Sequence, residues 1–214
     1  MVNMNQRNYQ KELDKIIEGL SEGEAPKKLF LHSCCAPCSS YVLEYLSQYF
    51  EITVLYYNPN ITYEEEYEYR KVEQKRLIGE MQSKYPIKFL DCDYDPENFF
   101  AAVKGYEKEP EGGARCKICF DMRLRKTAEL AACEKFDYFT TTLTISPLKN
   151  AELLNEIGAS ISAEYGVKYL NSDFKKRNGY KRSIELSKEY DLYRQDYCGC
   201  VYSKAERERA ICSE

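Results

Sequence analysis

Cysteine is the residue type in this chain whose spacing most clearly indicates chemistry, and seven of its ten cysteines lie in three short clusters. These clusters are Cys34-Cys35-Ala36-Pro37-Cys38, Cys116-Lys117-Ile118-Cys119 and Cys198-Gly199-Cys200. Two thiolates separated by two residues can reach one soft metal from a single turn of chain. A CCxxC, a CxxC and a further thiol pair in a chain of 214 residues therefore indicate metal or redox chemistry.

The adjacent thiols of Cys34 and Cys35 favour a cluster of several irons over a single ion. Their side chains start from neighbouring Cα atoms and need not point the same way, so one tetrahedral zinc would be an awkward partner for both. Together with Cys116 and Cys119 they supply the four thiolates that a [4Fe–4S] cluster takes. Spacing alone also leaves open a structural zinc site, and cysteines that merely pack as small apolar groups.

The other clustered thiols have several interpretations. Cys38 lies one turn beyond Cys35, where it could bind a second metal, act in redox chemistry or be a buried residue at a helix start. A disulfide between Cys198 and Cys200 would close a very small loop and should be strained and easily reduced, which favours a redox pair. A further pair of metal ligands, or two thiols without a role near a turn, are the alternatives.

Two polar segments are candidates for binding phosphate or bases. The segment 173–180 combines aromatic residues with three cations, Lys175, Lys176 and Arg177. Such a composition can hold phosphates and stack bases, although a solvated basic loop is the simpler interpretation. Ser146 and Lys149 precede a predicted helix, where anions bind readily and where a plain helix cap explains them equally well.

Strand-like and helix-like segments alternate along the chain and must position these residues. Apolar runs predict strands at 28–33, 51–57, 87–92, 137–142 and 167–170. Helical spacing predicts helices at 9–20, 39–50, 62–85, 150–165, 180–190 and 203–212, a short one capped by Asp95, and one to about Lys135. Thr62 and Glu65 have the spacing of a capping box, and the loop 107–114 leads to Cys116.

The alternation predicts an α/β fold, a doubly wound parallel sheet with helices on both faces. Ligands bind beyond the carboxyl ends of the strands in such sheets. Because the first cysteine cluster follows the first strand and 141–144 follows the fourth, we expect both to face one crevice. We expect a single domain over 1–214, with an N-terminal helical extension at 1–27 and a C-terminal helical segment at 171–214 that completes the site.

Composition narrows the class of protein further. No apolar run approaches the roughly 20 residues of a membrane helix, and the first 20 residues are too polar for a signal peptide. We therefore expect a cytoplasmic protein whose thiols are reduced or metal-bound, with no membrane partner. The net charge of −4 argues against a surface that binds nucleic acid throughout, but it allows a local basic face such as 123–126.

The order of these motifs resembles the QueH family of epoxyqueuosine reductases. The resemblance spans about 28–200 and rests on HSCCAPCS (32–39), RCKICFDMRL (115–124), TTTLTISPLKN (140–150) and DFKKRNGYKRSIELSKEYDLYRQDYCGC (173–200). It implies a fold resembling the adenine-nucleotide-binding doubly wound (HUP-like) families. The CCAPC turn, a metal-binding turn, then stands in place of their phosphate-binding loop, so ATP use is not expected.

The resemblance also implies a reaction, the reduction of epoxyqueuosine to queuosine at the wobble position of tRNA, the last step of that modification. The cluster ligands of the family map onto Cys34, Cys35, Cys116 and Cys119, and its redox-active disulfide maps onto Cys198 and Cys200. Cys38 lies where the family can carry an additional metal ligand, so a mononuclear iron is a second candidate cofactor. The implied partners are a tRNA carrying epoxyqueuosine in its anticodon loop and an external electron donor.

Converting an epoxide into an alkene takes two electrons and two protons and releases water. A cluster can deliver single electrons, and a metal with an open position can act as a Lewis acid on the epoxide oxygen. The candidate proton donors are Tyr197, Asp173 and His32, although a lone histidine on a predicted strand is more often a core residue. Two other functions are alternatives: a zinc-stabilised RNA-binding module, and a thiol–disulfide redox protein without cluster catalysis.

Overall fold

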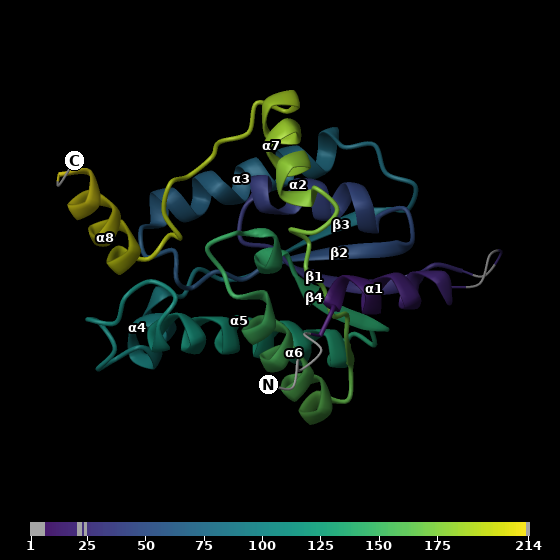
Figure 1. Cartoon of the computed structure of the whole chain (residues 1–214), viewed down its shortest axis with the longest axis horizontal. Coiled ribbons are helices and arrows are strands. Elements are labelled where there is room, and N and C mark those ends of the chain that lie inside the picture. Colours follow the sequence, from purple (N-terminus) through teal and green to yellow (C-terminus); the bar gives the residue numbers. More distant parts are fainter. Residues whose placement is uncertain (1–6, 21–22, 24, 213–214) are drawn as a thin grey trace, which may run out of the picture.

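The computed structural model describes residues 7–20, 23 and 25–212. These described residues form five strands, all parallel, in one sheet with the order β3-β2-β1-β4-β5. The strands are β1 (Lys27–His32), β2 (Phe50–Tyr56), β3 (Ile87–Asp91), β4 (Tyr138–Thr141) and β5 (Lys168–Tyr169). Helices cover both faces of this sheet, which confirms the predicted α/β fold (Figure 1).

The helices pack in two layers. They are α1 (Tyr9–Glu18), α2 (Ala36–Leu46), α3 (Glu64–Glu80), α4 (Pro96–Ala102), α5 (Ala114–Cys133), α6 (Ala151–Tyr165), α7 (Gly179–Glu189) and α8 (Val201–Ile211), with a short 3-10 turn, η1 (Thr142–Ile145). Figure 1 shows α2, α3 and α7 on one side of the sheet and α5 and α6 on the other. In the described part of the chain, no helix combines the length and apolarity that crossing a membrane requires.

The central strand β1 is buried from both sides. Leu29 and Leu31 pack into one apolar cluster with Val42 of α2, whereas Phe30 packs into the opposite cluster with Leu124 of α5. This division follows from the two-residue period of a strand, which sends successive side chains to opposite faces. Fully burying one such side chain contributes about 1.5–3 kcal/mol, so these layers hold the carboxyl end of β1 in place.

The strand order reverses beside β1, and ligands bind at such a reversal. The chain runs from β1 outward to β3 and then returns to β4 on the other side of β1. Cys34 follows β1 and Thr142 follows β4, and the Cys34 Sγ lies 3.7 Å from the Thr142 Oγ1. The expectation that both segments face one crevice is confirmed.

Several predicted boundaries are wrong. The helix after the first cysteine cluster begins at Ala36 rather than Ser39, because a proline at 37 fits the first turn. The capping box at Thr62 does not form, since α3 begins at Glu64 and the Thr62 Oγ1 instead accepts a hydrogen bond from the Val201 backbone N at 3.0 Å. That bond anchors the start of α8 to the start of α3.

The two terminal segments are only partly within the described structure. Of the predicted extension at 1–27, residues 1–6, 21, 22 and 24 lie outside the described residues, and the rest contains α1 and the start of β1. Residues 213 and 214 of the predicted C-terminal segment also lie outside them. The part of that segment that is described contains α7 and α8, joined by a connection that passes the end of the sheet.

Candidate metal and substrate site

Three thiols gather where β1 runs into α2, and we call Cys34, Cys35 and Cys38 the first thiol group. Their Sγ atoms all lie within 4.8 Å of one another, and those of Cys34 and Cys35 are 3.7 Å apart. Two thiolates on one tetrahedral ion with bonds of about 2.3 Å stand about 3.8 Å apart. The adjacent thiols are therefore not awkward partners for a single ion, contrary to expectation, and the group could bind a metal.

Hydrogen bonds among the three thiols of the first group shift their pKa values in opposite directions. Hydrogen bonds from Cys35 and Cys38 hold the pKa of Cys34 well below its usual range. The same bond to Cys34 raises the pKa of Cys35 to about 12, and bonds to both neighbours raise the pKa of Cys38 well above its usual value. Cys34 is thus the thiolate of the group, and binding a metal through all three must release protons.

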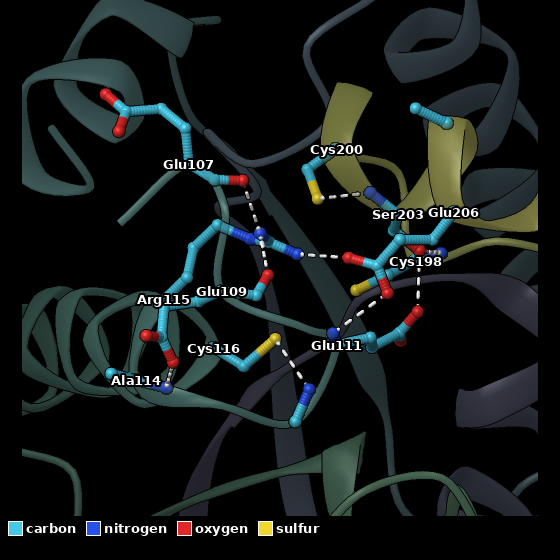
Figure 2. Close-up of polar contacts among 12 residues, drawn as sticks. Glu107, Glu109, Glu111, Ala114, Arg115, Cys116, Cys198, Cys200, Ser203 and Glu206 are labelled. Carbon is cyan, nitrogen blue, oxygen red and sulfur yellow. Dashed lines mark hydrogen bonds and ion pairs between the residues drawn. The ribbon is translucent and has the colours of Figure 1, made fainter. Parts of the chain in front are cut away.

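The other four clustered cysteines form a second thiol group at the N-terminal end of α5. Cys116 and Cys119 lie on the first turns of α5, and Cys198 and Cys200 lie just before α8. All four line one small cavity together with Phe99 and Phe120 among others. Figure 2 shows the thiols of Cys116, Cys198 and Cys200 converging from these two segments.

The two thiol groups do not form one compact set in this structure, although Cys198 also lines the cavity next to the first group. Among the residues that the structure describes, the first group is the only set of three or more His, Cys, Asp or Glu side chains with all ligand atoms within 4.8 Å. The four predicted cluster ligands are therefore divided, two in each group. Burial raises the pKa of Cys119 to about 12 and that of Cys200 to about 11, so both carry protons at neutral pH in the absence of a metal.

A polar network holds the second group in place (Figure 2). The Gly112 backbone N donates to the Cys116 Sγ at 3.2 Å, and the Ser203 backbone N donates to the Cys200 Sγ at 3.3 Å. The Ser203 hydroxyl accepts from the Cys198 backbone N at 3.1 Å and donates to Glu111 at 2.7 Å. The loop before α5 and the start of α8 are thereby tied to each other around the thiols.

Arg115 adds to this network an ion pair in which the arginine is buried and the carboxylate is partly exposed. Its side chain is 1% exposed and lies 2.9 Å from the carboxylate of Glu206 on α8. The same guanidinium donates to the carbonyls of Glu107 and Glu109 in the loop before α5. Arg115 therefore ties the start of α5 and the loop before it to α8 (Figure 2).

The first thiol group opens onto a cavity of about 280 Å³. Its wall combines thiols, cations and aromatic rings, among them Cys34, Cys38, Cys198, Arg70, Arg123, Lys149, Arg194, Tyr180 and Tyr197. A volume near 300 Å³ is at the lower end of small-molecule sites. Ser146 and Lys149, which the sequence singled out as anion-binding candidates, both line this cavity.

The other predicted phosphate-binding cations lie outside the cavity. The Lys175 Nζ lies 3.0 Å from both the Thr144 carbonyl and a carboxylate oxygen of Asp173. Arg177 pairs with Asp14 of α1 at 2.5 Å. These two cations anchor the segment to the protein body, while the Lys176 side chain is exposed and forms no ion pair with the described residues.

Sequence analysis missed two buried arginines beside the thiols. Arg70 of α3 donates to Glu66 at 2.7 Å and to the carbonyls of Cys198 and Tyr197 at 3.3 and 3.4 Å. Arg123 belongs to the segment expected as a basic face, but its side chain is fully buried. Its spacing of four and seven residues from Cys119 and Cys116 places all three on one face of a helix, and this signal was available in the sequence.

The three candidate proton donors have different environments. His32 is a core histidine, with Nδ1 2.9 Å from the Thr141 Oγ1 and Nε2 3.2 Å from the Tyr57 carbonyl. Burial lowers the pKa of His32 to about 3, so its ring is neutral at pH 7. Asp173 is paired with Lys175 away from the cavity, whereas Tyr197 lines it, and burial raises the pKa of Tyr197 to about 12.

Comparisons with known proteins agree on one family. The family model described as "Epoxyqueuosine reductase QueH" matches residues 29–206. A protein of that name from Streptococcus pyogenes serotype M1 is 45% identical over 205 residues, covering 94% of this chain and 80% of the relative. Its namesake from Staphylococcus epidermidis is 47% identical over 201 residues, with 92% and 84% covered. That from Thermotoga maritima is 35% identical over 185 residues, with 84% and 91% covered.

Proposed function

This chain belongs to the epoxyqueuosine reductase QueH family, and we propose that it is the oxidoreductase that reduces epoxyqueuosine to queuosine at the wobble position of tRNA. In this proposal the reaction uses a [4Fe–4S] cluster. The observation that carries the proposal is the first thiol group, which faces a cation-lined cavity where the strand order reverses. Thiolates are the ligands that iron–sulfur clusters take. The same cavity offers room for a small ring system.

We assign Cys34, Cys35, Cys116 and Cys119 as the cluster ligands, with two from each thiol group. A centre held in this way must lie at the boundary between the groups, and the buried guanidinium of Arg123 supplies hydrogen-bond donors there that lack a protein partner. Cys38, the third thiol of the first group, is assigned to an additional mononuclear iron. When bound, the cluster supplies electrons one at a time to the epoxide.

The residues of the chain would bind the substrate and move protons. Ser146 and Lys149 offer a hydroxyl and a cation to an anionic or carbonyl group of the nucleotide. Tyr197 keeps its proton at neutral pH because burial raises its pKa, so its phenol can donate to the oxygen released when the epoxide opens. Oxidation of the Cys198 and Cys200 thiols to a disulfide would yield two electrons and two protons, which balances the reduction and the water released.

The cavity dimensions favour one nucleotide as the substrate. A volume of about 280 Å³ admits a single base and excludes a duplex, so the wobble nucleotide must be turned out of the anticodon loop. The connection between α7 and α8 completes the wall, since 194–198 line the cavity. An external electron donor must restore the thiols after each turnover. We place the reaction in the cytoplasm, where its tRNA substrate is found.

The test is turnover by protein purified without oxygen. Such protein is expected to be brown, to contain iron and sulfide, and to convert tRNA-bound epoxyqueuosine into queuosine with a chemical reductant, as measured by mass spectrometry of the digested nucleosides. A colourless zinc protein that binds tRNA without turnover would instead support the RNA-binding module. Thiol–disulfide exchange in iron-free protein, without epoxide reduction, would support the redox protein without a cluster.

A further inference from the structure

Arg123 is a fully buried cation with most of its hydrogen-bonding capacity unused. Its Nε donates to the Cys119 carbonyl at 3.2 Å, which is a normal bond within α5. Its Nη1 and Nη2 are buried and have no hydrogen-bond partner among the described residues, and the guanidinium lies over the ring of Phe120, 5.7 Å from its centroid. Burying an unpaired charge lowers the free energy of unfolding. A guanidinium at this position therefore destabilises the protein when nothing else is bound.

Arg70 is a useful contrast, because it is a second buried arginine that lines the same cavity. Its Nε, Nη1 and Nη2 all donate, to Glu66, the Cys198 carbonyl and the Tyr197 carbonyl. The fold therefore does provide partners for a buried guanidinium where one has a structural role. Nη1 and Nη2 of Arg123 have no such hydrogen-bond partners. They therefore indicate a bound group that the polypeptide does not supply.

The surroundings of Arg123 define the chemistry of that group. Thiols of both groups lie around Arg123, since Cys34 and Cys198 line the same cavity and Cys119 precedes Arg123 by one turn of α5. Other polar neighbours include His32, which is neutral, and Lys149, which repels a cation. The carboxylates of Glu111 and Asp196 line the same cavity, but neither forms a hydrogen bond with Arg123, so sulfur is left as the carrier of the negative charge that its free donors can meet.

We propose that Arg123 is the counter-cation of the metal centre, with Nη1 and Nη2 donating hydrogen bonds to its thiolate or sulfide sulfurs. This inference rests on the proposed cluster. A positive charge beside the centre stabilises the state with one more electron, so Arg123 raises the reduction potential and makes electron uptake from the donor easier. Because it acts through the centre and not on the substrate, it is a positioning residue rather than a catalytic one.

The experiment compares Arg123→Met, which removes the charge and the donors, with Arg123→Lys, which keeps the charge alone. Metal-free Arg123→Met protein is expected to melt no lower than the parent, because losing an unpaired buried charge is neutral or stabilising. Reconstituted Arg123→Met is expected to have a more negative midpoint potential, followed by electron paramagnetic resonance, and to lose iron to a chelator about tenfold faster. Arg123→Lys should keep a potential closer to that of the parent.

Arg70→Met is the control for metal-free stability, and its melting temperature should fall because it leaves the partners of Arg70 unpaired. An unchanged potential and an unchanged rate of iron loss in Arg123→Met would overturn the inference. Metal-free Arg123→Met protein that cannot fold would overturn it as well, since Arg123 would then have a structural role. Parent protein that takes up neither iron nor sulfide would overturn the proposed function and the inference together.

Discussion

The Nε2 of Gln195 lies 2.7 Å from the Sγ of Cys35, so a residue from the connection between α7 and α8 contacts the turn after β1. Helix α3 holds that connection in place. Arg76 donates to the Tyr190 carbonyl at 2.9 Å, and Glu73 accepts from the Tyr193 backbone N at 3.0 Å. The thiol group therefore depends on a chain of contacts from α3 through the C-terminal segment.

We expect Gln195→Ala to fold normally and to hold its metal centre less firmly. A hydrogen bond to a charged group contributes about 1.5–3 kcal/mol, so the loss of this donor should speed bleaching of the brown colour in air by about tenfold or more. The measurement is visible absorbance against time after exposure to oxygen. Gln48→Ala, which changes an exposed glutamine in the turn after α2, should bleach like the parent. Equal rates for both variants would show that Gln195 does not support the centre.

The anchor at Glu73 predicts a dependence of stability on pH. The hydrogen bond from Arg76, followed by that from the Tyr193 backbone N, lowers the pKa of Glu73 below 4.5. Because the folded pKa is depressed, the stabilisation is fully present above pH 4.5 and is lost as the pH falls through the folded value. Metal-free parent protein should therefore lose melting temperature below pH 4.5 more steeply than Glu73→Gln.

At neutral pH the Glu73→Gln variant should already melt lower than the parent. The loss of about 1 kcal/mol corresponds to roughly 2–4 °C for a chain of this size. Glu80→Gln is the matched control on the same helix, since Glu80 is more exposed and contacts only Arg76. A parallel pH profile for parent and Glu73→Gln would show that the carboxylate contributes nothing to this anchor.

Much of the fold was predictable because the runs of apolar residues in the sequence coincide with the strands of the sheet. Strands β1 to β4 were expected within one residue of their observed ends, since each is a run of largely apolar residues bounded by turn-forming or polar ones. The meeting of Cys34 with Thr142 followed from parallel topology alone. Strand β5 is shorter than expected, with two residues, because its pairing with β4 covers only two positions.

The arginines beside the thiols illustrate what the pattern could not show. The run 123–126 looked like one basic face, yet a helix turns about 100° per residue and separates its members. Arg123 points inward, while Arg125 pairs with Asp121 and Glu164 at the surface. Likewise, the partition of seven thiols into two groups depends on where the segment before α8 lies relative to α5, and the Arg115–Glu206 ion pair that links them joins residues distant in sequence.

The proposed ligand set predicts how iron content responds to substitution. Cys34→Ser, Cys35→Ser, Cys116→Ser and Cys119→Ser should each lose most of the cluster iron and sulfide and all epoxide reduction. Cys133→Ser is the matched control, because Cys133 is exposed at the far end of α5. Iron and sulfide per chain are measured after anaerobic reconstitution. Full iron content in Cys116→Ser and Cys119→Ser would refute the assignment and would place the metal on the first thiol group alone.

The cavity predicts which cations contribute to tRNA binding. Lys149→Met should weaken binding of the modified anticodon loop, because Lys149 lines the cavity.

Lys176→Ala should reduce the slope of tRNA affinity against salt concentration by about one ion without changing the cluster, since its exposed amine would contact a phosphate. Arg177→Ala should act mainly through stability, because it removes the ion pair with Asp14. Binding measured across a salt series separates these cases, and identical slopes for parent and Lys176→Ala would make the segment a solvated loop.

The last prediction separates the two proposed tasks of the second thiol group. Cys198→Ala and Cys200→Ala should keep the brown cluster yet fail at multiple turnovers. The reason is that the two thiols would supply electrons and protons that an external donor must restore.

The turn between Cys198 and Cys200 is held tightly, since a Cβ on Gly199 would lie 2.8 Å from a side-chain carbon of Ile61 and the φ of Gly199 is +119°. Gly199→Ala should therefore slow multiple turnover as well, while leaving both thiols present. The measurement is queuosine formed per chain over time, together with iron per chain. If Cys198→Ala or Cys200→Ala loses iron in proportion to activity, these thiols are metal ligands. If both variants turn over normally, electrons reach the metal centre directly from the external donor.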